Sequence, residues 1–219
     1  MLGATERRRT GPVVRLALAV AEDAVRGSGL EPGGLRSVFG SSNGDGVVVG
    51  RILEDLARAG PGEKVVSPTQ FHNSVHNAAA GYWSIGHGSR EPATCLGAHD
   101  ATWAASLLKA GVEMAAEGEA VLLCVYDHPL PAPLAALRPT ADPFGAGFVL
   151  GPAGGEGVGF RLGFVAGVGR AVGLPPAFEG VRAGNPAAQC LPLLVALARG
   201  EAAGLVFPYG DGHLVMEVG

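Results

Sequence analysis

One short run of small residues has the residue types and spacing of a catalytic turn. Residues 40–44 read GSSNG, the G-x-S-x-G pattern that exposes a serine nucleophile between a strand and a helix in many hydrolases. Asp211 and His213 follow Ser42 in the chain order that such enzymes use. No HGGG-like segment that would supply an oxyanion hole precedes the run. A tight turn in a chain with 36 glycines is the simpler explanation, so a serine hydrolase using Ser42 is a remote alternative.

The histidines, cysteines and glycine runs do not indicate a metal or a cofactor. His72 and His76 are four residues apart, but no carboxylate or cysteine ligand accompanies them. Cys95, Cys124 and Cys190 lie in separate apolar segments and form no C-x-x-C pair. The glycine runs also miss the G-x-G-x-x-G spacing of a dinucleotide-binding turn. We therefore expect neither a metal nor a cofactor.

Composition excludes several classes of protein. The 219 residues fit one domain, and 47% hydrophobic against 16% charged residues argues against a disordered chain. The net charge is −4 and no basic stripe follows Arg7, Arg8 and Arg9, which argues against a nucleic-acid partner. No apolar run approaches the ~20 residues that cross a bilayer, and the N-terminus lacks the apolar core of a signal peptide. With its odd, unpaired cysteines, the chain is expected to be cytoplasmic and to have no membrane partner.

Short apolar runs alternate with helical patterns over the first 127 residues, which predicts an α/β fold with a mainly parallel sheet. The expected strands are 35–40, 93–98 and 120–126, and the expected helices are 12–27, 47–59, 74–86 and 100–117. After a proline-rich stretch, residues 148–150 and 160–168 are expected to form a β-ribbon. A helix at 187–199 and strands at 204–207 and 213–218 complete the expected elements.

The most specific pattern lies in residues 67–127. The segment NAAAG at 77–81 leads through GSREP at 88–92 to a strand, and the strand turns into a long helix at Asp100. This order resembles the β-ketoacyl synthases of the thiolase superfamily, in which an N-x-x-A-G segment and a G-x-R-G-P-like turn precede a strand and then the nucleophilic cysteine. The family's spacing between that Asn and that Cys, counted from Asn77, ends at Asp100. Segments 38–41, 118–127 and 147–151 also resemble family segments, so the resemblance covers residues 12–168.

The resemblance implies a thiolase-like fold, a layered α/β arrangement around a mainly parallel mixed sheet. An ordinary ketosynthase is about twice as long as this chain, so we expect essentially the N-terminal half of that fold with the C-terminal half largely deleted. Residues 1–219 are then one ketosynthase-like domain, in which 186–219 retain the closing strands. A strand that such folds place before the first helix is expected to be missing or very short, which would make the sheet dependent on a partner.

Two departures from the family pattern bear on activity. Asp100 occupies the nucleophile position, and a carboxylate cannot carry an acyl chain as a thioester. At that place it is expected to cap the first N–H groups of the helix. Cys95 lies five residues earlier, inside the expected strand. The two histidines of the family's second half have no counterpart, so we expect no catalytic residue and no condensing activity from this chain alone.

What the resemblance then implies is a chain-length factor, the noncatalytic partner of an active β-ketoacyl synthase in type II polyketide or fatty-acid-like pathways such as aryl polyene synthesis. The partners would be that ketosynthase, in a heterodimer, and an acyl carrier protein. The alternative is a free-standing ketosynthase-like protein that binds acyl carrier protein or decarboxylates a malonyl thioester. Against it, Asp100 would place a negative charge where a malonyl carboxylate or an enolate must sit.

The family's dimer seam implies that residues 93–98 and 100–108 form the interface, with 72–83 beside it. The candidate tunnel or interface residues are Asn77, Tyr82, Trp83, Leu96, His99, Asp100, Trp103 and Phe148. Packing in the hydrophobic core explains the aromatic residues equally well, and both explanations stay open at this point.

Overall fold

A four-stranded sheet forms the centre of the computed structural model, which describes residues 2–60, 62–63 and 66–219. Its strand order is β2-β1-β3-β4. The strands are β1 (Arg36–Gly40), β2 (Ala93–Leu96), β3 (Val121–Asp127) and β4 (Phe144–Leu150). β1 pairs in parallel with β2 and β3, and β4 pairs antiparallel with β3. The sheet is therefore mixed and mainly parallel, as the sequence predicts.

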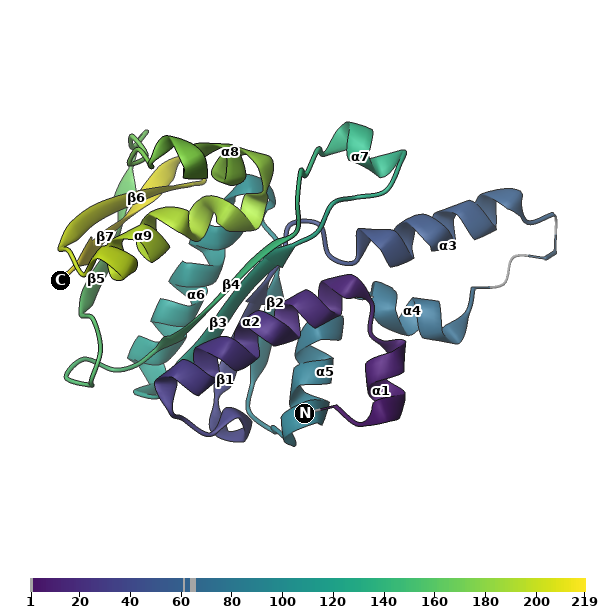
Figure 1. The fold of residues 1–219 in the computed structure, drawn as a ribbon, viewed down its shortest axis with the longest axis horizontal. Coiled ribbons are helices and arrows are strands. Elements are labelled where there is room, and N and C mark those ends of the chain that lie inside the picture. Colours follow the sequence, from purple (N-terminus) through teal and green to yellow (C-terminus); the bar gives the residue numbers. More distant parts are fainter. Residues whose placement is uncertain (1, 61, 64–65) are drawn as a thin grey trace.

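Helices cover both faces of this first sheet (Figure 1). The helices α2 (Pro12–Ser28) and α5 (Ala78–His87) pack on one face, and α6 (Thr102–Glu117) packs on the other. α2 buries an apolar stripe at helical spacing that includes Ala17 and Ala21, and it ends at Gly29, whose φ of 69° favours glycine. The layered α/β architecture expected from the sequence is confirmed.

A second sheet lies beyond α6 and shares its core. It contains β5 (Phe160–Ala166), β6 (Ala203–Tyr209) and β7 (Gly212–Val218), all antiparallel in the order β5-β7-β6. The expected ribbon of 148–150 with 160–168 is wrong, because β4 completes the first sheet against β3 while β5 pairs with β7. Only tertiary contacts decide which strand each segment pairs with. Around this sheet lie η3 (Pro186–Cys190), α9 (Leu191–Arg199) and α8 (Pro176–Gly184), the last of which the sequence analysis did not predict.

The expected helix over 74–86 is also wrong in part, because the structure has two helices there. α4 (Pro68–Ser74) ends at Val75, whose ψ of 144° is extended, and α5 begins after Asn77. The amide of Asn73 fixes this break: it donates to the Arg9 carbonyl at 3.0 Å and accepts from the Tyr82 hydroxyl at 3.0 Å. α4 packs against α3 (Gly46–Arg58), and the two extend away from the sheet (Figure 1).

The remaining short elements are α1 (Ala4–Arg9), η1 (Pro32–Gly34), η2 (His99–Ala101) and α7 (Leu134–Leu137). Within the described residues no strand precedes α2. No helix among them is long and apolar enough to cross a bilayer.

Candidate functional site

The turn that carries Asp100 is sharp and held by hydrogen bonds. β2 ends at Leu96, and the η2 turn leads into α6 at Thr102. His99 has a φ of 53° and is the one described non-glycine residue in the left-handed region, a conformation that costs free energy. The Thr102 hydroxyl closes the turn, since it donates to the His99 carbonyl at 2.7 Å and accepts from the Ala98 N–H at 2.9 Å. The strand–turn–helix arrangement expected around Asp100 is therefore present, although the α-helix begins two residues later than predicted.

Asp100 is not a helix cap, contrary to the expectation. Its Oδ1 accepts from Arg138 Nη2 at 2.6 Å, and its Oδ2 lies 3.2 Å from His99 Nδ1. Arg138 also contacts His99 Nε2, so one arginine reaches both residues of the turn. The Asp100 side chain is 74% exposed while that of Arg138 is 17% exposed. The exposed carboxylate of Asp100 is thus bound by a guanidinium group that is largely buried. Sequence reasoning missed this ion pair because Arg138 is 38 residues from Asp100.

A cavity of about 440 Å³ adjoins this turn, between the start of α6 and the second sheet. Asp100 and Trp103 line it from one side, and Phe207 and Tyr209 line it from β6. Trp103 is 1% exposed, and its ring lies 5.3 Å from that of Phe148 and 5.6 Å from that of Phe207. In the part of the chain that the structure describes, Trp103 Nε1 has no hydrogen-bond partner. Trp103 is therefore both a core residue and a wall of this cavity, with Phe148 packed beside it.

The other aromatic candidates lie on the opposite face of the first sheet. Tyr82 and Trp83 belong to α5 and are 2% and 1% exposed. Burial raises the pKa of the Tyr82 hydroxyl, which donates to Asn73. Asn77 is exposed just before α5, and Leu96 ends β2 half-buried against the α6 side of the core. The structure thus brings together His99, Asp100, Trp103 and Phe148 but keeps Tyr82 and Trp83 away from them.

β2 is an edge strand with one free side. The carbonyls of Pro92 and Leu96 accept from Ser37 and Ser41, so the even-numbered residues face β1. The backbone groups of residues 93, 95 and 97 therefore point away from the sheet. Nearby on α5 and α6, Ile85 and Val112 are 60% and 56% exposed.

Cys95 is a poor nucleophile where it stands on this edge strand. Its side chain is half-buried, and burial raises the pKa of the thiol to about 11. At neutral pH it is a neutral thiol, whereas nucleophilic attack needs the thiolate. A thiol in this environment is poorly suited to the role of the family's catalytic cysteine.

The hydrolase alternative finds no support in the geometry. Ser42 Oγ is buried, and it has no hydrogen-bond partner in the described ranges. His213 Nδ1 instead contacts the Gly167 carbonyl at 2.8 Å, in the second sheet. The described residues also include no group of three histidine, cysteine or acidic side chains able to hold a metal ion.

The GSSNG run forms the tight turn that was the simpler explanation, and Asp127 is a partner that local sequence did not indicate. Asp127, at the end of β3, accepts from Ser41 Oγ at 2.9 Å and from the Asn43 N–H at 2.8 Å. Ser41 Oγ in turn accepts from the Gly44 N–H at 2.9 Å. Burial raises the pKa of Asp127, which is 0% exposed. The turn therefore serves to tie the ends of β1 and β3 together.

Comparison with known proteins gives two kinds of match. A family model described as the N-terminal domain of β-ketoacyl synthase matches residues 1–162, close to the 12–168 expected from the motifs. No curated protein matches the sequence significantly.

Two solved structures match almost the whole chain. One is the complex of the ketosynthase ApeO with its chain length factor ApeC from Xenorhabdus doucetiae, at 20% identity and a TM-score of 0.72. The other is the ishigamide ketosynthase/chain length factor, at 15% identity and a TM-score of 0.68. Each alignment covers 99% of this chain and 82% of the matched chain. These identities show likeness of fold alone, whereas the family match spans most of the sequence: the chain belongs to the β-ketoacyl synthase family, through its N-terminal domain.

Proposed function

We propose that this chain is a chain-length-factor-like, noncatalytic subunit that pairs with an active β-ketoacyl synthase. The observation that carries the proposal is Asp100, which stands on the turn between β2 and α6 where the family resemblance places the nucleophilic cysteine. A ketosynthase holds the growing chain as a thioester, which requires a thiolate at that point. Asp100 is instead held by Arg138 in a 2.6 Å ion pair, an arrangement with no acyl-carrying group.

The shape of the chain supports pairing. β2 has a free edge, and exposed apolar side chains lie on the helices at either side of it. An unpaired edge of this kind favours addition of another strand, and natural monomers usually cover it or protect it with charge. Extension of the first sheet across the β2 edge by the partner's strand would satisfy the outward N–H and C=O groups of residues 93, 95 and 97. The Asp100 turn would then lie at the seam.

The solved neighbours support the same assembly. Both are described as complexes of a ketosynthase with a chain length factor. Each matched chain is only modestly longer than this one, whereas the resemblance sets an ordinary ketosynthase at about twice its length. We infer by analogy that residues 1–219 act as one domain, that 186–219 supply its closing strands, and that an acyl carrier protein delivers substrate to the complex. A polyketide or fatty-acid-like pathway, such as aryl polyene synthesis, is the proposed setting.

The test is reconstitution with a ketosynthase from the same organism. We expect light scattering to show a 1:1 complex, and condensation of malonyl-carrier protein to require both chains. Replacing the partner's catalytic cysteine by alanine should abolish condensation, whereas Asp100→Ala in this chain should leave chemistry on the partner's cysteine intact. A chain that ignores the ketosynthase would overturn the proposal.

The free-standing alternative is tested in the same material. It requires the isolated chain to release CO₂ from malonyl-carrier protein, with the release lost in Asp100→Ala. We expect no release above a no-protein control, because the resemblance assigns this chain neither the cysteine nor the two histidines that act on the thioester in the family.

A further inference from the structure

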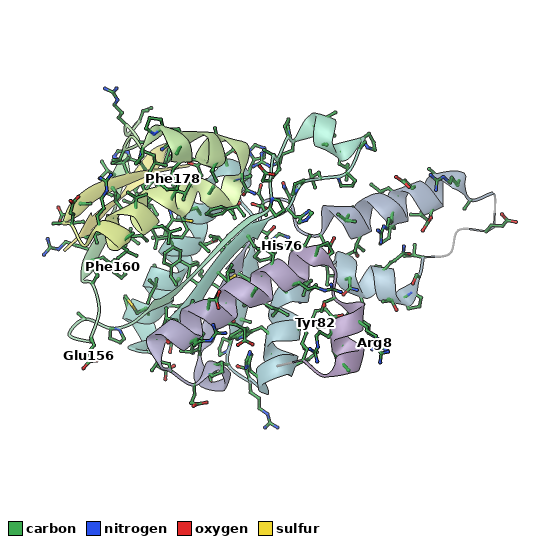
Figure 2. All side chains as sticks on the ribbon, in the orientation of Figure 1. Arg8, His76, Tyr82, Glu156, Phe160 and Phe178 are labelled. Atoms are coloured by element: carbon green, nitrogen blue, oxygen red, sulfur yellow. The ribbon has the colours of Figure 1, made fainter. Side chains whose placement is uncertain are left out.

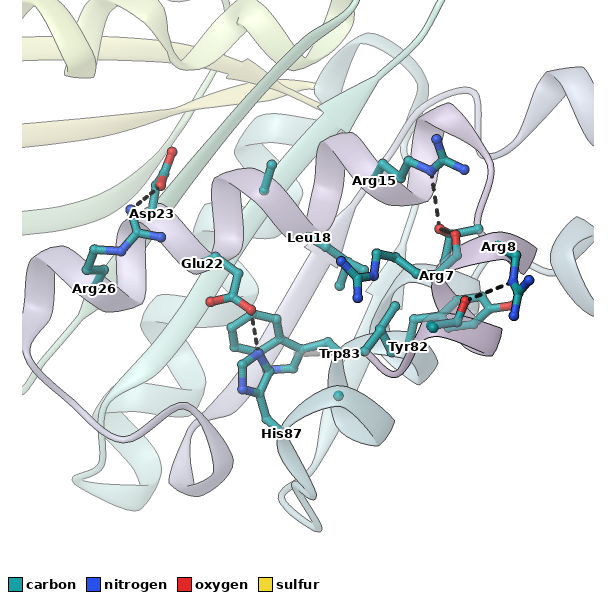
Figure 3. Close-up of a pocket in the computed structure, with 15 residues that line it drawn as sticks. Arg7, Arg8, Arg15, Leu18, Glu22, Asp23, Arg26, Tyr82, Trp83 and His87 are labelled. Atoms are coloured by element: carbon teal, nitrogen blue, oxygen red, sulfur yellow. Dashed lines mark hydrogen bonds and ion pairs between the residues drawn. The ribbon is translucent and has the colours of Figure 1, made fainter.

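A second and larger cavity lies on the face of the first sheet opposite Asp100. Residues of α1, α2 and α5 line an open cavity of about 850 Å³ (Figure 3), a volume within the range of small-molecule sites. Its apolar lining consists of the half-buried Leu2 and Leu18, with the buried rings of Tyr82 and Trp83 beneath them. The pairing surface proposed above does not include these residues.

The charged residues around this cavity are unevenly balanced. Glu22 pairs with His87 at 3.0 Å, and Asp23 pairs with Arg26 at 2.8 Å, so both acids have a cationic or histidine partner. Arg7 has no hydrogen bond or ion pair from its guanidinium to any described residue. In Figure 3 its side chain extends from α1 toward Leu18 of α2.

Among the described residues, the side chains of two further arginines at the cavity bond to neutral oxygens alone. Arg8 Nε donates to the Ala4 carbonyl at 3.3 Å, and Arg15 Nε donates to the Thr10 hydroxyl at 3.3 Å. Figure 2 shows that Arg8 and Tyr82 lie on the same side of the molecule. The cavity thus combines an apolar lining with three exposed guanidinium groups that pair with no carboxylate of the described residues, which favours an anionic ligand.

The apolar lining of the cavity restricts the class of anion that would bind there. A small inorganic anion would leave the apolar lining in contact with water, while a neutral lipid would gain nothing from the exposed Arg7 guanidinium. A carboxylate can accept two parallel N–H bonds from one guanidinium, and an alkyl chain behind it would bury against the leucines and the aromatic rings. We propose that this cavity binds a long-chain alkyl carboxylate, with the carboxylate on Arg7 and the chain along Leu2 and Leu18, above the buried rings of Tyr82 and Trp83.

The chain contains two tryptophans, so ligand binding can be followed by tryptophan fluorescence. In a Trp103→Phe variant, Trp83 is the remaining tryptophan and lines the cavity. Titration of this full-length variant with 12-bromododecanoate should give saturable quenching below the micellar concentration, because bromine quenches indole at short range. Calorimetry of the wild-type chain with dodecanoate checks binding without any tryptophan change.

Two matched comparisons test the role of charge. Arg7→Ala in the Trp103→Phe background should weaken binding about tenfold, as should use of the methyl ester in place of the acid. Arg51→Ala removes an exposed arginine on α3 outside the cavity and should leave binding unchanged. In the Trp83→Phe variant, the remaining Trp103 should not be quenched.

The proposal is overturned by any of three results. These are absence of saturable quenching together with absence of heat, equal affinity for acid and ester with no effect of Arg7→Ala, or quenching of Trp103 in the Trp83→Phe protein. If the cavity instead binds an acidic segment of another protein, bromododecanoate would not quench Trp83. That outcome is the first of the three results. None of these results bears on pairing with a ketosynthase, so the two proposals fail separately.

Discussion

Asp127 ends β3 and Asp100 follows β2, and because both strands run parallel to β1, which lies between them, both residues lie toward the same carboxyl end of the first sheet. Asp127 is 0% exposed and its Oδ1 accepts from Ser41 and Asn43, whereas Asp100 is 74% exposed and is held by Arg138. A buried carboxylate with partners on its own chain serves the fold. An exposed carboxylate on a strained turn contributes little to folding and is free to face a partner. We therefore interpret Asp127 as structural, and Asp100 as the position that the proposed function assigns to a partner.

The largest expected effect separates these two roles by stability. Asp127→Ala leaves the Ser41 hydroxyl and the Asn43 N–H buried without their acceptor, and we expect a loss of about 3 kcal/mol in the free energy of unfolding. Asp100→Ala removes an exposed ion pair and should cost less than about 1 kcal/mol. Urea unfolding of both variants measures the difference. Equal losses would contradict the assignment of roles.

The second effect concerns the cysteine nearest to Asp100. Since burial raises the pKa of Cys95 to about 11, its thiolate fraction near pH 8 is on the order of a hundredfold below that of a free cysteine. We expect iodoacetamide to modify Cys95 correspondingly slowly, with a rate that increases up to about pH 11. Peptide mass spectrometry distinguishes Cys95 from the buried Cys124 and Cys190. Rapid modification at pH 7 would indicate an activated thiol and would reopen the question of catalysis.

A smaller effect follows from the raised pKa of Asp127. In the unfolded chain this carboxyl titrates near its ordinary value of 3.8, while burial holds its pKa higher in the folded protein. Folding therefore favours the protonated form of Asp127. Its contribution to the free energy of unfolding is complete below pH 3.8 and is lost as pH rises through the pKa of the folded state. Asp127→Asn cannot ionise, and we expect the stability of wild type relative to this variant to decrease over that interval. A relative stability that rises with pH would show that the hydrogen bonds from Ser41 and Asn43 outweigh burial.

Local pattern predicted the parts of the site that are continuous in sequence. The apolar runs of β1 and β3, the strand before Asp100 and the long helix after it are each strong local signals, and their order carried the family resemblance. The contacts that decide roles are long-range. Arg138 reaches Asp100 across 38 residues and Asp127 reaches Ser41 across 86, and no periodicity encodes either pair.

The same reason explains the errors in the expected fold. The break between α4 and α5 depends on Asn73 bonding to Arg9, which is 64 residues away. The separation of β4 from β5 depends on which strand each one meets in space. The candidate tunnel residues do not form one group, because Tyr82 and Trp103 lie on opposite faces of the first sheet. Only the three-dimensional packing of the helices determines this.

The central claim is that the free edge of β2 pairs with a ketosynthase, and one pair of matched substitutions tests it. Ala93→Pro removes an outward N–H from the β2 edge, and proline is tolerated at the first residue of an edge strand. Ala166→Pro removes an outward N–H from β5, a free edge of the second sheet. The Gly159 carbonyl accepts from the Gly219 N–H, and the Gly167 N–H donates to the Asp211 carbonyl. The backbone groups of odd-numbered residues in β5 therefore face β7, and those of Ala166 face outward.

The measurement is the dissociation constant of the complex with the ketosynthase, by sedimentation or light scattering, for wild type and both variants. We predict that Ala93→Pro weakens pairing at least about tenfold while Ala166→Pro binds as wild type does, with both variants folded by circular dichroism. Equal affinities for Ala93→Pro and wild type, or a greater loss in Ala166→Pro, would contradict the account.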